Sequence, residues 1–116
     1  MVIAGIDPGT ATTGYGVIKI VRGKRGQKEK LLWIAHGVIE TSKNELAQER
    51  LLLLEQELQL LLSKHKPDLV SVERLFFFKN AKTAIPVSEA RGVILLTVAK
   101  NKVALKEFTP LQAKMA

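Results

Sequence analysis

The sequence contains no cysteine, and this absence excludes several kinds of site at once. Disulfide bonds, zinc sites built from thiolates and a cysteine nucleophile are all ruled out, so the fold must be stabilised by ordinary burial of apolar side chains. A reducing compartment suits such a chain, and we expect a cytoplasmic protein.

Long apolar runs are also missing. The longest mainly apolar stretches, such as Val93 to Ala99, are far shorter than the roughly 20 residues that span a bilayer. The N-terminal segment has no basic leader and reaches Asp7 and Pro8 too early for a signal peptide. We therefore expect a soluble protein without a membrane partner.

Acidic residues are few relative to basic ones. Eighteen lysines and arginines stand against eleven aspartates and glutamates, which gives a formal charge of +7 over 116 residues. A chain of this length predicts one compact domain with a single core. The charge favours an anionic partner such as nucleic acid or a membrane surface, but surface lysine is common and only 5% of the residues are aromatic. Charge alone does not identify the partner.

The first forty residues have the pattern of three strands. Val2 to Asp7 is an apolar run that ends in a carboxylate and is stopped by a proline and a glycine. Alternating apolar residues predict further strands over Gly14–Val21 and Leu31–Glu40, with a glycine-punctuated basic turn at 22–30 between them. The simplest assembly is an antiparallel meander.

Helical spacing follows the meander. Ser42, with Glu45 three residues later, resembles a capping box and predicts a helix from there to about His65. Asp68 to Glu73 predicts a short strand. Because a helix lies between them, this strand should run parallel to the first one.

A second helix is predicted from near Thr83 to Asn101. Its regular part should begin only a residue or two before Pro86, because proline does not sit deep in a helix. Val103–Phe108 predicts the last strand, and Thr109-Pro110 predicts the start of another helix. The whole order predicts an α/β fold, with a mixed five-stranded sheet flanked by helices.

Two acidic residues, Asp7 and Glu73, each close an apolar strand. If those strands are parallel neighbours, both carboxylates emerge at the same edge of the sheet, where ligands collect in α/β folds. Two oxygen donors there could hold Mg²⁺, which takes one or two protein carboxylates and keeps waters for a substrate phosphate. Capping of a neighbouring helix or loop explains the same two residues equally well.

Two loops at the same edge have features of nucleic-acid contacts. The turn at 5–14 is rich in glycine and threonine and could meet a phosphate, although many tight hairpins look the same. Three consecutive aromatics, Phe76 to Phe78, precede Lys79. One ring could stack on a base while Lys79 contacts a phosphate, or the rings could pack onto the next helix or a second subunit.

Other charged and small residues carry a weaker signal. The basic turn at 22–30 and the lysines near the end of the chain are usually no more than solvated charge. Arg91-Gly92 lies inside a predicted helix, where glycine costs about 0.5 to 1 kcal/mol relative to alanine. Such a glycine suggests the close approach of another backbone.

Taken in order, these motifs resemble the RuvC family of Holliday junction resolvases, and the resemblance runs over essentially the whole chain. Each motif is modest alone, and the ordered set is specific. The motifs are Gly5-Ile6-Asp7-Pro8-Gly9 with Gly14-Tyr15-Gly16, Pro67-Asp68 leading to Val72-Glu73, Phe76 with Lys79-Asn80-Ala81, Ala90-Arg91-Gly92-Val93, and Thr109-Pro110.

The resemblance implies a ribonuclease H-like fold and a crossover junction endodeoxyribonuclease that cuts four-way DNA junctions in recombination and repair. It further implies a homodimer, Mg²⁺ or Mn²⁺ in each subunit, and a branch-migration helicase complex as partner. By position, Asp7 and Glu73 would be the first two catalytic and metal-binding carboxylates. The remaining assignments are Phe76, Lys79, Lys114 and Thr13 as DNA-binding residues, and Arg91 and Gly92 at the dimer interface.

The family completes its site with two further aspartates on a final helix, and this sequence stops before them. We accordingly expect residues 1–116 to form a single ribonuclease H-like domain without the family's final helices, and to cut little or nothing alone. Two alternatives stay open. One is a non-catalytic DNA-binding or dimerising module, and the other is a phosphate-binding domain, because Asp7-Pro8-Gly9-Thr10 also resembles the first phosphate loop of actin-like ATPases and sugar kinases.

Overall fold

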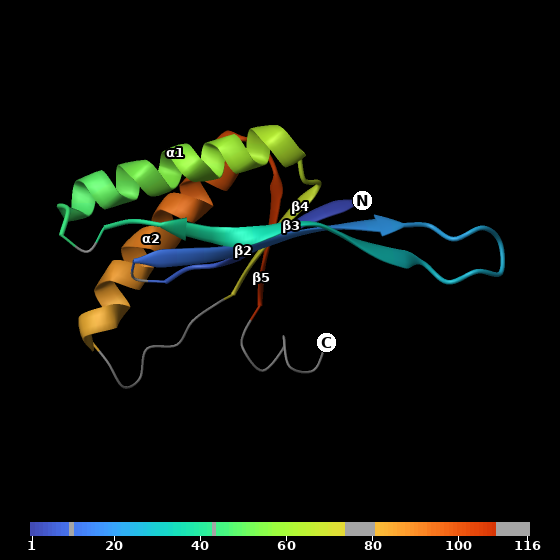
Figure 1. Ribbon diagram of the computed structural model, residues 1–116, viewed down its shortest axis with the longest axis horizontal. Coiled ribbons are helices and arrows are strands. Elements are labelled where there is room, and N and C mark those ends of the chain that lie inside the picture. The colour runs from blue at the N-terminus through green and yellow to red at the C-terminus, as the bar shows by residue number, and fades with distance from the viewer. Residues whose placement is uncertain (10, 43, 74–80, 109–116) are drawn as a thin grey trace.

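Five strands and two helices make up the computed structural model, which describes residues 1–9, 11–42, 44–73 and 81–108, with side chains in the last range from Ala84 onward (Figure 1). The strand order in the sheet is β3-β2-β1-β4-β5. The elements are β1 (Val2–Asp7), β2 (Thr12–Val21), β3 (Lys30–Glu40), α1 (Ala47–His65), β4 (Leu69–Glu73), α2 (Ala81–Lys100) and β5 (Ala104–Phe108).

The sheet is mixed, as the sequence predicted. Strands β1, β2 and β3 pair antiparallel, whereas β4 runs parallel to both β1 and β5. The antiparallel half is joined by short turns, and each parallel connection passes through a helix, which is the connection that parallel strands require. The predicted meander of three strands followed by two parallel strands is confirmed.

The two described helices pack on one face of the sheet. Strand alternation in β1 turns Ala4 and Ile6 toward that face, and both are buried. They join Val70 of β4, Leu58 of α1 and Ile94 of α2 in one apolar core. On the opposite face β1 presents Gly5 and Asp7, so the core and the predicted carboxylate site lie on different sides of the sheet.

Strands β2 and β3 extend beyond the other strands of the sheet. Strand β1 pairs with only the Gly14–Lys19 part of β2, while the β2–β3 pairing continues as far as Val21 opposite Lys30. In Figure 1 this ribbon and its connecting turn project away from the helices, along the 53 Å longest axis of the molecule. We call residues 20–31 the β2–β3 arm.

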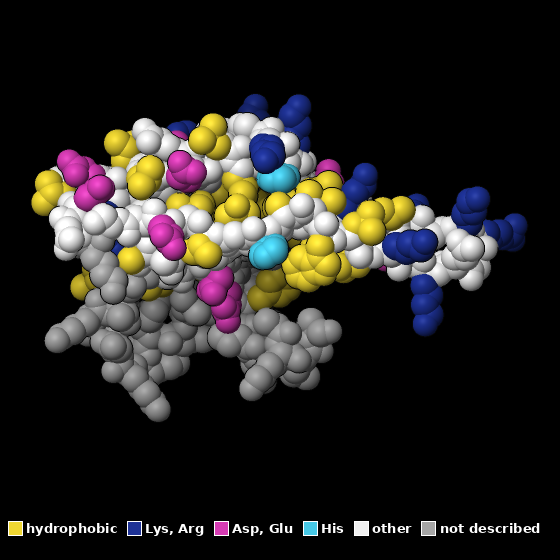
Figure 2. Space-filling view, viewed as in Figure 1, with side chains coloured by type: hydrophobic (Ala, Val, Ile, Leu, Met, Phe, Trp, Pro, Cys, Tyr) yellow, Lys and Arg dark blue, Asp and Glu magenta, His cyan; other side chains and the backbone are white. Residues whose placement is uncertain are grey.

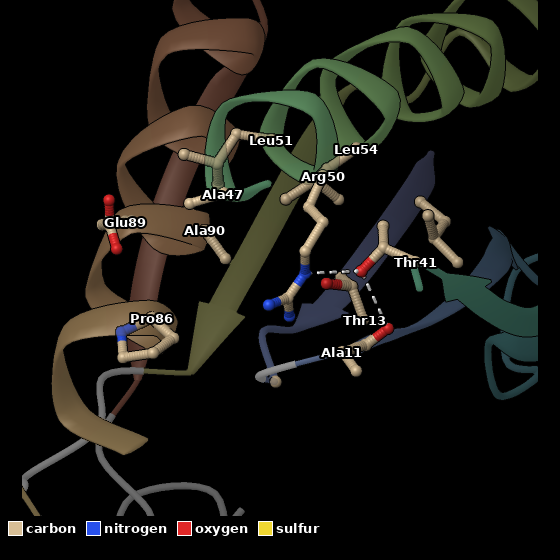
Figure 3. Close-up of a pocket in the computed structure, with 12 residues that line it drawn as sticks. Ala11, Thr13, Thr41, Ala47, Arg50, Leu51, Leu54, Pro86, Glu89 and Ala90 are labelled. Atoms are coloured by element: carbon tan, nitrogen blue, oxygen red, sulfur yellow. Dashed lines mark hydrogen bonds between the residues drawn. The ribbon is translucent and has the colours of Figure 1, made fainter. Parts of the chain in front are cut away.

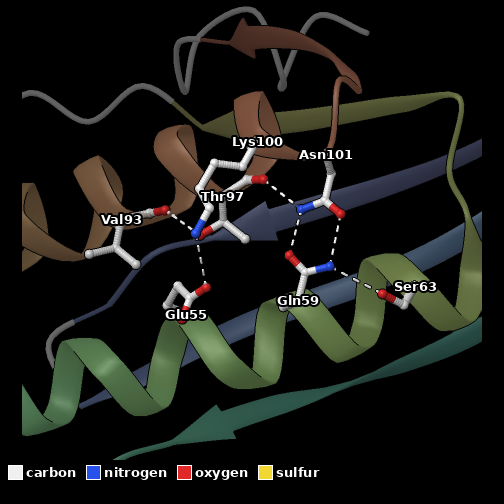
Figure 4. Close-up of polar contacts among 7 residues, drawn as sticks. All are labelled: Glu55, Gln59, Ser63, Val93, Thr97, Lys100 and Asn101. Carbon is white, nitrogen blue, oxygen red and sulfur yellow. Dashed lines mark hydrogen bonds and ion pairs between the residues drawn. The ribbon is translucent and has the colours of Figure 1, made fainter.

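Polar contacts fix the C-terminal end of α2 against α1 (Figure 4). The amides of Gln59 on α1 and Asn101 after α2 exchange two hydrogen bonds of 2.8 and 2.7 Å. The Asn101 amide also donates to the Thr97 carbonyl at 2.7 Å, and Lys100 forms an ion pair with Glu55. These contacts hold the point where the chain leaves α2 and enters β5.

The predicted capping box at Ser42 and Glu45 is wrong. The Ser42 hydroxyl accepts a hydrogen bond from the Asn44 amide at 3.2 Å, and its carbonyl accepts one from the Glu45 amide at 3.3 Å. These residues therefore form a turn before the helix. Helix α1 begins at Ala47, and its N-cap residue, Leu46, makes no side-chain capping bond.

Helix α2 begins at Ala81, within two residues of the predicted start near Thr83. The prediction that its regular part begins only a residue or two before Pro86 is wrong, because Pro86 is the sixth residue of the helix. A proline so near the start removes only one hydrogen bond of the i to i−4 ladder, to the carbonyl of residue 82. Burial of Val87 and Ala90 just beyond it offsets that loss. The helix start predicted at Thr109-Pro110 lies outside the described residues.

Neither helix in the described part of the chain is both long and apolar enough to cross a bilayer.

Candidate functional site

The carboxyl ends of β1 and β4 bring Asp7 and Glu73 together. The strands pair in parallel, with Gly5 opposite Ser71 and Ile6 opposite Val72, so Asp7 and Glu73 are the next residues at the same level. Alternation turns both side chains to the face away from the helices. Segments 66 residues apart in the sequence thus place two carboxylates on one rim of the sheet.

Both carboxylates line one open groove on this face. Glycines form much of its floor, and a β-carbon added at Gly14 would lie only 3.9 Å from that of Asp7. An alanine there would make ordinary contact with Asp7, and a longer side chain would extend into the groove. The groove is lined by Gly5, Ile6, Asp7, Gly14, Tyr15, Gly16, Ser71, Glu73 and Phe108.

The two carboxylates make no ion pair or side-chain hydrogen bond with another described residue, and Asp7 is exposed while Glu73 is half-buried. Within the described ranges, no third histidine, aspartate or glutamate joins them. Two oxygen donors suit Mg²⁺, because this ion is usually held by one or two protein carboxylates and completes its octahedron with waters and phosphate oxygens. The donor set therefore fits a divalent cation of this kind.

Thr13 lies on the other side of the sheet. It is only 4% exposed and lines a small cavity under the helices, together with Arg50 of α1 and Pro86 of α2 (Figure 3). Its hydroxyl is therefore separated from the groove of Asp7 and Glu73 by the sheet itself. The assignment of Thr13 as a DNA-binding residue stays a prediction, and its burial does not support it.

The same cavity contains two residues that the sequence analysis missed. The Arg50 Nε donates to the Thr41 hydroxyl at 3.5 Å, and that hydroxyl donates to the Ala11 carbonyl at 3.2 Å (Figure 3). This chain of contacts ties the turn that follows Asp7 to the first turn of α1. No local pattern marks either residue, because their contacts join segments far apart in the sequence.

Arg91 and Gly92 point in different directions. The Arg91 guanidinium donates to the Glu107 carboxylate of β5, and the Arg91 Nε is buried without a partner. Gly92 is exposed, and a β-carbon added there would have no neighbour within 4 Å. Of the predicted interface pair, Gly92 thus faces outward, whereas Arg91 contacts its own sheet. The predicted DNA-binding residues Phe76, Lys79 and Lys114 lie outside the described residues.

A comparison with protein families identifies the chain. The family model described as crossover junction endodeoxyribonuclease RuvC matches residues 3–116. The chain belongs to this family. RuvC proteins are metal-dependent nucleases that resolve Holliday junctions, so the family and the enzyme class predicted from the motifs are confirmed.

Relatives and solved structures agree with this assignment. The crossover junction endodeoxyribonucleases RuvC of Caldicellulosiruptor saccharolyticus and Petrotoga mobilis are each 48% identical over the whole chain, which covers 67% and 68% of their length. The structure of Thermus thermophilus RuvC in complex with a Holliday junction substrate superposes with a TM-score of 0.86 at 30% identity, over 99% of this chain and 70% of that one. The predicted ribonuclease H-like fold is confirmed.

The chain spans between 57% and 71% of the length of the curated relatives that it matches. Neither alternative, the non-catalytic module or the ATPase-like phosphate-binding domain, is favoured by these relatives.

Proposed function

We propose that this chain is a Holliday junction resolvase in which Asp7 and Glu73 are catalytic residues that bind Mg²⁺, with Mn²⁺ as a substitute. One observation carries the proposal. The parallel pairing of β1 and β4 sets these two carboxylates side by side on an open, glycine-lined groove, on the face that the helices leave uncovered. Membership of the RuvC family supplies the four-way junction as the substrate class.

The chain's own residues contribute charge and space to this site. Asp7 and Glu73 would supply anionic oxygen ligands, and the small residues Gly14 and Ser71 leave room beside them for a phosphodiester group. A bound divalent cation supplies Lewis-acid stabilisation of the charge that develops on the phosphate oxygens. The exposure of Asp7 keeps this position open to a substrate as large as DNA.

Further DNA contacts are proposed from the sequence. Phe76 and Lys79 follow Glu73 by three and six residues, and Lys114 follows the groove residue Phe108 by six. Three residues of extended chain span at most about 11 Å, so Phe76 is tied to the neighbourhood of Glu73. We propose base stacking for Phe76 and phosphate contacts for the two lysines.

We also propose a homodimer formed through the outer side of α2. Ile85 and Leu96 are large apolar side chains with exposed fractions of 68% and 58%, and the exposed Gly92 lies between them. Spacings of seven and four residues put all three on one side of a helix. Gly92 would let the matching helix of a second subunit approach closely, with the same patch of both subunits meeting at a two-fold axis. A cytoplasmic location and a branch-migration helicase complex as partner are proposed on the family resemblance alone.

Substitution of Gly92 tests the dimer. Gly92→Leu should weaken self-association by at least about tenfold, because the new side chain fills the space that a second helix would need. It should leave the free energy of unfolding of the monomer unchanged or raised by up to about 1 kcal/mol, since leucine favours an exposed helix more than glycine does. Sedimentation velocity over a concentration series measures the first effect, and unchanged association would remove Gly92 from the interface.

Cation binding tests the carboxylate site. We expect Asp7→Asn and Glu73→Gln each to lower the affinity for Mn²⁺ by at least about tenfold, because each removes one anionic ligand. The matched control is Glu57→Gln, which changes an exposed glutamate on α1. Electron paramagnetic resonance of free Mn²⁺ measures the affinity. Equal affinity in all three variants would show that the two carboxylates do not share a cation.

Junction binding tests the substrate. In competition gel shifts, the chain should prefer a four-way junction to a linear duplex of the same length and sequence by at least about tenfold. In a chain that also carries the family's final helix, cutting of a labelled junction in Mn²⁺ should fall below detection on Glu73→Gln, while junction affinity changes less than about threefold. Equal affinity for duplex and junction would contradict the proposed function, and cutting by Glu73→Gln at the rate of the unsubstituted complete chain would remove Glu73 from the site.

A further inference from the structure

The β2–β3 arm carries more than half of the chain's net charge. Its turn at 22–30 holds five basic residues and one acidic residue, a net charge of +4 in a chain of +7. All six charged side chains are exposed. Figure 2 shows lysine and arginine side chains gathered around the far end of the projecting ribbon. The basic residues are Arg22, Lys24, Arg25, Lys28 and Lys30.

This charge sits on a folded hairpin. Val21 and Lys30 are paired at the base of the turn, and the Gln27 amide donates to the Lys24 carbonyl at 2.7 Å. Gly26 has a φ of +85°, which the third position of a type II turn requires and which glycine adopts without strain. None of the five basic side chains forms an ion pair with a described residue. The turn therefore presents uncompensated positive charge from a defined position.

The β2–β3 arm is also connected to the face of the sheet that carries the carboxylate groove. Val17 is buried under the helices, so the next residue, Ile18, and its partner Trp33 turn to the face of the carboxylate groove. Trp33 is 74% exposed, and one of its ring atoms lies 3.8 Å from the position of a β-carbon added at Gly16, which lines that groove. A continuous surface thus runs from the carboxylates past Trp33 to the basic turn.

We infer that the β2–β3 arm binds the phosphate backbone of one duplex arm of the junction, at a distance from the point of cutting. The inference rests on the proposed function for the identity of the DNA. Charge complementarity indicates that DNA binds the arm, because exposed lysines and arginines match the closely spaced phosphates of a duplex. Each phosphate that they neutralise releases bound counterions, which favours binding. An acidic protein partner is the competing occupant.

Strand geometry gives the position at which the arm meets the DNA. Gly14 pairs with Asp7, and Val21 is seven residues further along β2. At about 3.3 Å per residue, the base of the turn lies about 23 Å along the ribbon from the carboxylates. A duplex advances about 3.4 Å per base pair, so an arm of DNA that runs alongside the ribbon meets the basic turn about seven base pairs from the site of cutting.

The experiment removes charge from the turn and keeps its backbone. The arm variant is Lys24→Gln, Arg25→Gln and Lys28→Gln together, with Gly26 unchanged. The control variant is Lys64→Gln, Lys66→Gln and Lys102→Gln, which removes the same charge from exposed positions at the ends of α1 and α2. Fluorescence anisotropy of labelled junctions gives the affinity over a series of KCl concentrations. Quenching of Trp33, the single tryptophan of the chain, reports DNA on this face.

With junction arms of fifteen base pairs, we expect the arm variant to bind at least about tenfold more weakly than the unsubstituted chain near 0.1 M salt. The slope of log affinity against log salt should become shallower by about 0.9 for each phosphate that the turn no longer neutralises, and Trp33 quenching should decrease. The control variant should change affinity less than about threefold. A junction arm of five base pairs closed by a loop is only about 17 Å long, too short to extend to the basic turn. On junctions with such short arms, the arm variant and the control variant should therefore bind with equal affinity.

The outcomes separate the arm from the proposed function. An arm variant that keeps the unsubstituted slope on long arms would overturn the inference and favour a protein partner for the turn. An equal loss of affinity on long and short arms would overturn it as well, because the turn would then bind near the junction centre. If the unsubstituted chain binds linear duplex as tightly as junction, the proposed function is contradicted instead. A shallower salt slope for the arm variant on linear duplex would then still support phosphate binding by the β2–β3 arm. Far-UV circular dichroism checks that both variants are folded.

Discussion

The two faces of the sheet differ in the size, polarity and exposure of their side chains. The face under α1 and α2 is built from branched apolar side chains, and residues such as Val70, Val72 and Leu58 have no exposed surface. The opposite face carries glycines along β1 and β2, two carboxylates at its rim and an exposed tryptophan. The chain's own helices cover one face, and the other face leaves room for a bound ligand.

This contrast shows how one sheet serves two purposes. Because side chains alternate along a strand, β1 can bury Ala4 and Ile6 while it presents Gly5 and Asp7 on the other side. Burial on the helix side supplies the stability that lets polar and small residues be kept on the open side. Substitutions should therefore separate into those that change stability and those that change binding.

The largest effect should come from the helix side. Leu58→Ala removes a fully buried side chain from the middle of the core, and we expect the free energy of unfolding to fall by about 2 to 5 kcal/mol. Leu60→Ala is the matched control, because Leu60 lies two residues away on the same helix with 64% of its surface exposed. Its effect should stay within about 0.5 kcal/mol. Urea denaturation measures both, and equal losses of stability would show that the helix layer is not packed as described.

The elements that follow from local pattern were predicted well. The strand that ends at Asp7 has the predicted bounds, and the strand that ends at Glu73 has the predicted C-terminal residue, because an apolar run closed by a carboxylate is visible in the sequence. Their parallel pairing follows from the intervening helix. It was this pairing that allowed the two carboxylates to be predicted on the same edge of the sheet.

The features that depend on distant contacts were missed or misplaced. Helix α1 begins at Ala47, where Leu51 and Leu54 pack on the core and Arg50 bonds Thr41 just after β3, and the nearby Ser42 does not cap it. The projection of the β2–β3 arm depends on where β1 stops pairing, which no pattern within residues 14–40 reveals. The sequence therefore predicts a basic turn between two strands but not its place at the end of a projecting ribbon.

An effect of intermediate size, on Mn²⁺ affinity, should come from filling the groove on the open face. Gly14→Leu places a side chain beside Asp7, and we expect Mn²⁺ affinity to fall by about tenfold, which corresponds to about 1.4 kcal/mol. Stability should be unchanged or slightly raised, since glycine weakens a strand. Gly14→Ala should give less than half of this free-energy change because its methyl group makes only ordinary contact with Asp7. A Gly14→Leu protein that binds Mn²⁺ normally would show that the groove is not the cation site.

The smallest effect should come from the tip of the β2–β3 arm, which belongs to neither face. Gly26→Ala puts a β-carbon at a φ of +85°, and we expect a cost of about 1 kcal/mol that is confined to the turn. Because the turn has no contact with the core, the destabilisation should appear as faster amide hydrogen exchange at Gln27, whose amide closes the turn, with exchange in α1 and β4 unchanged. Faster exchange throughout the sheet would instead show that the arm folds together with the core and contributes to its stability.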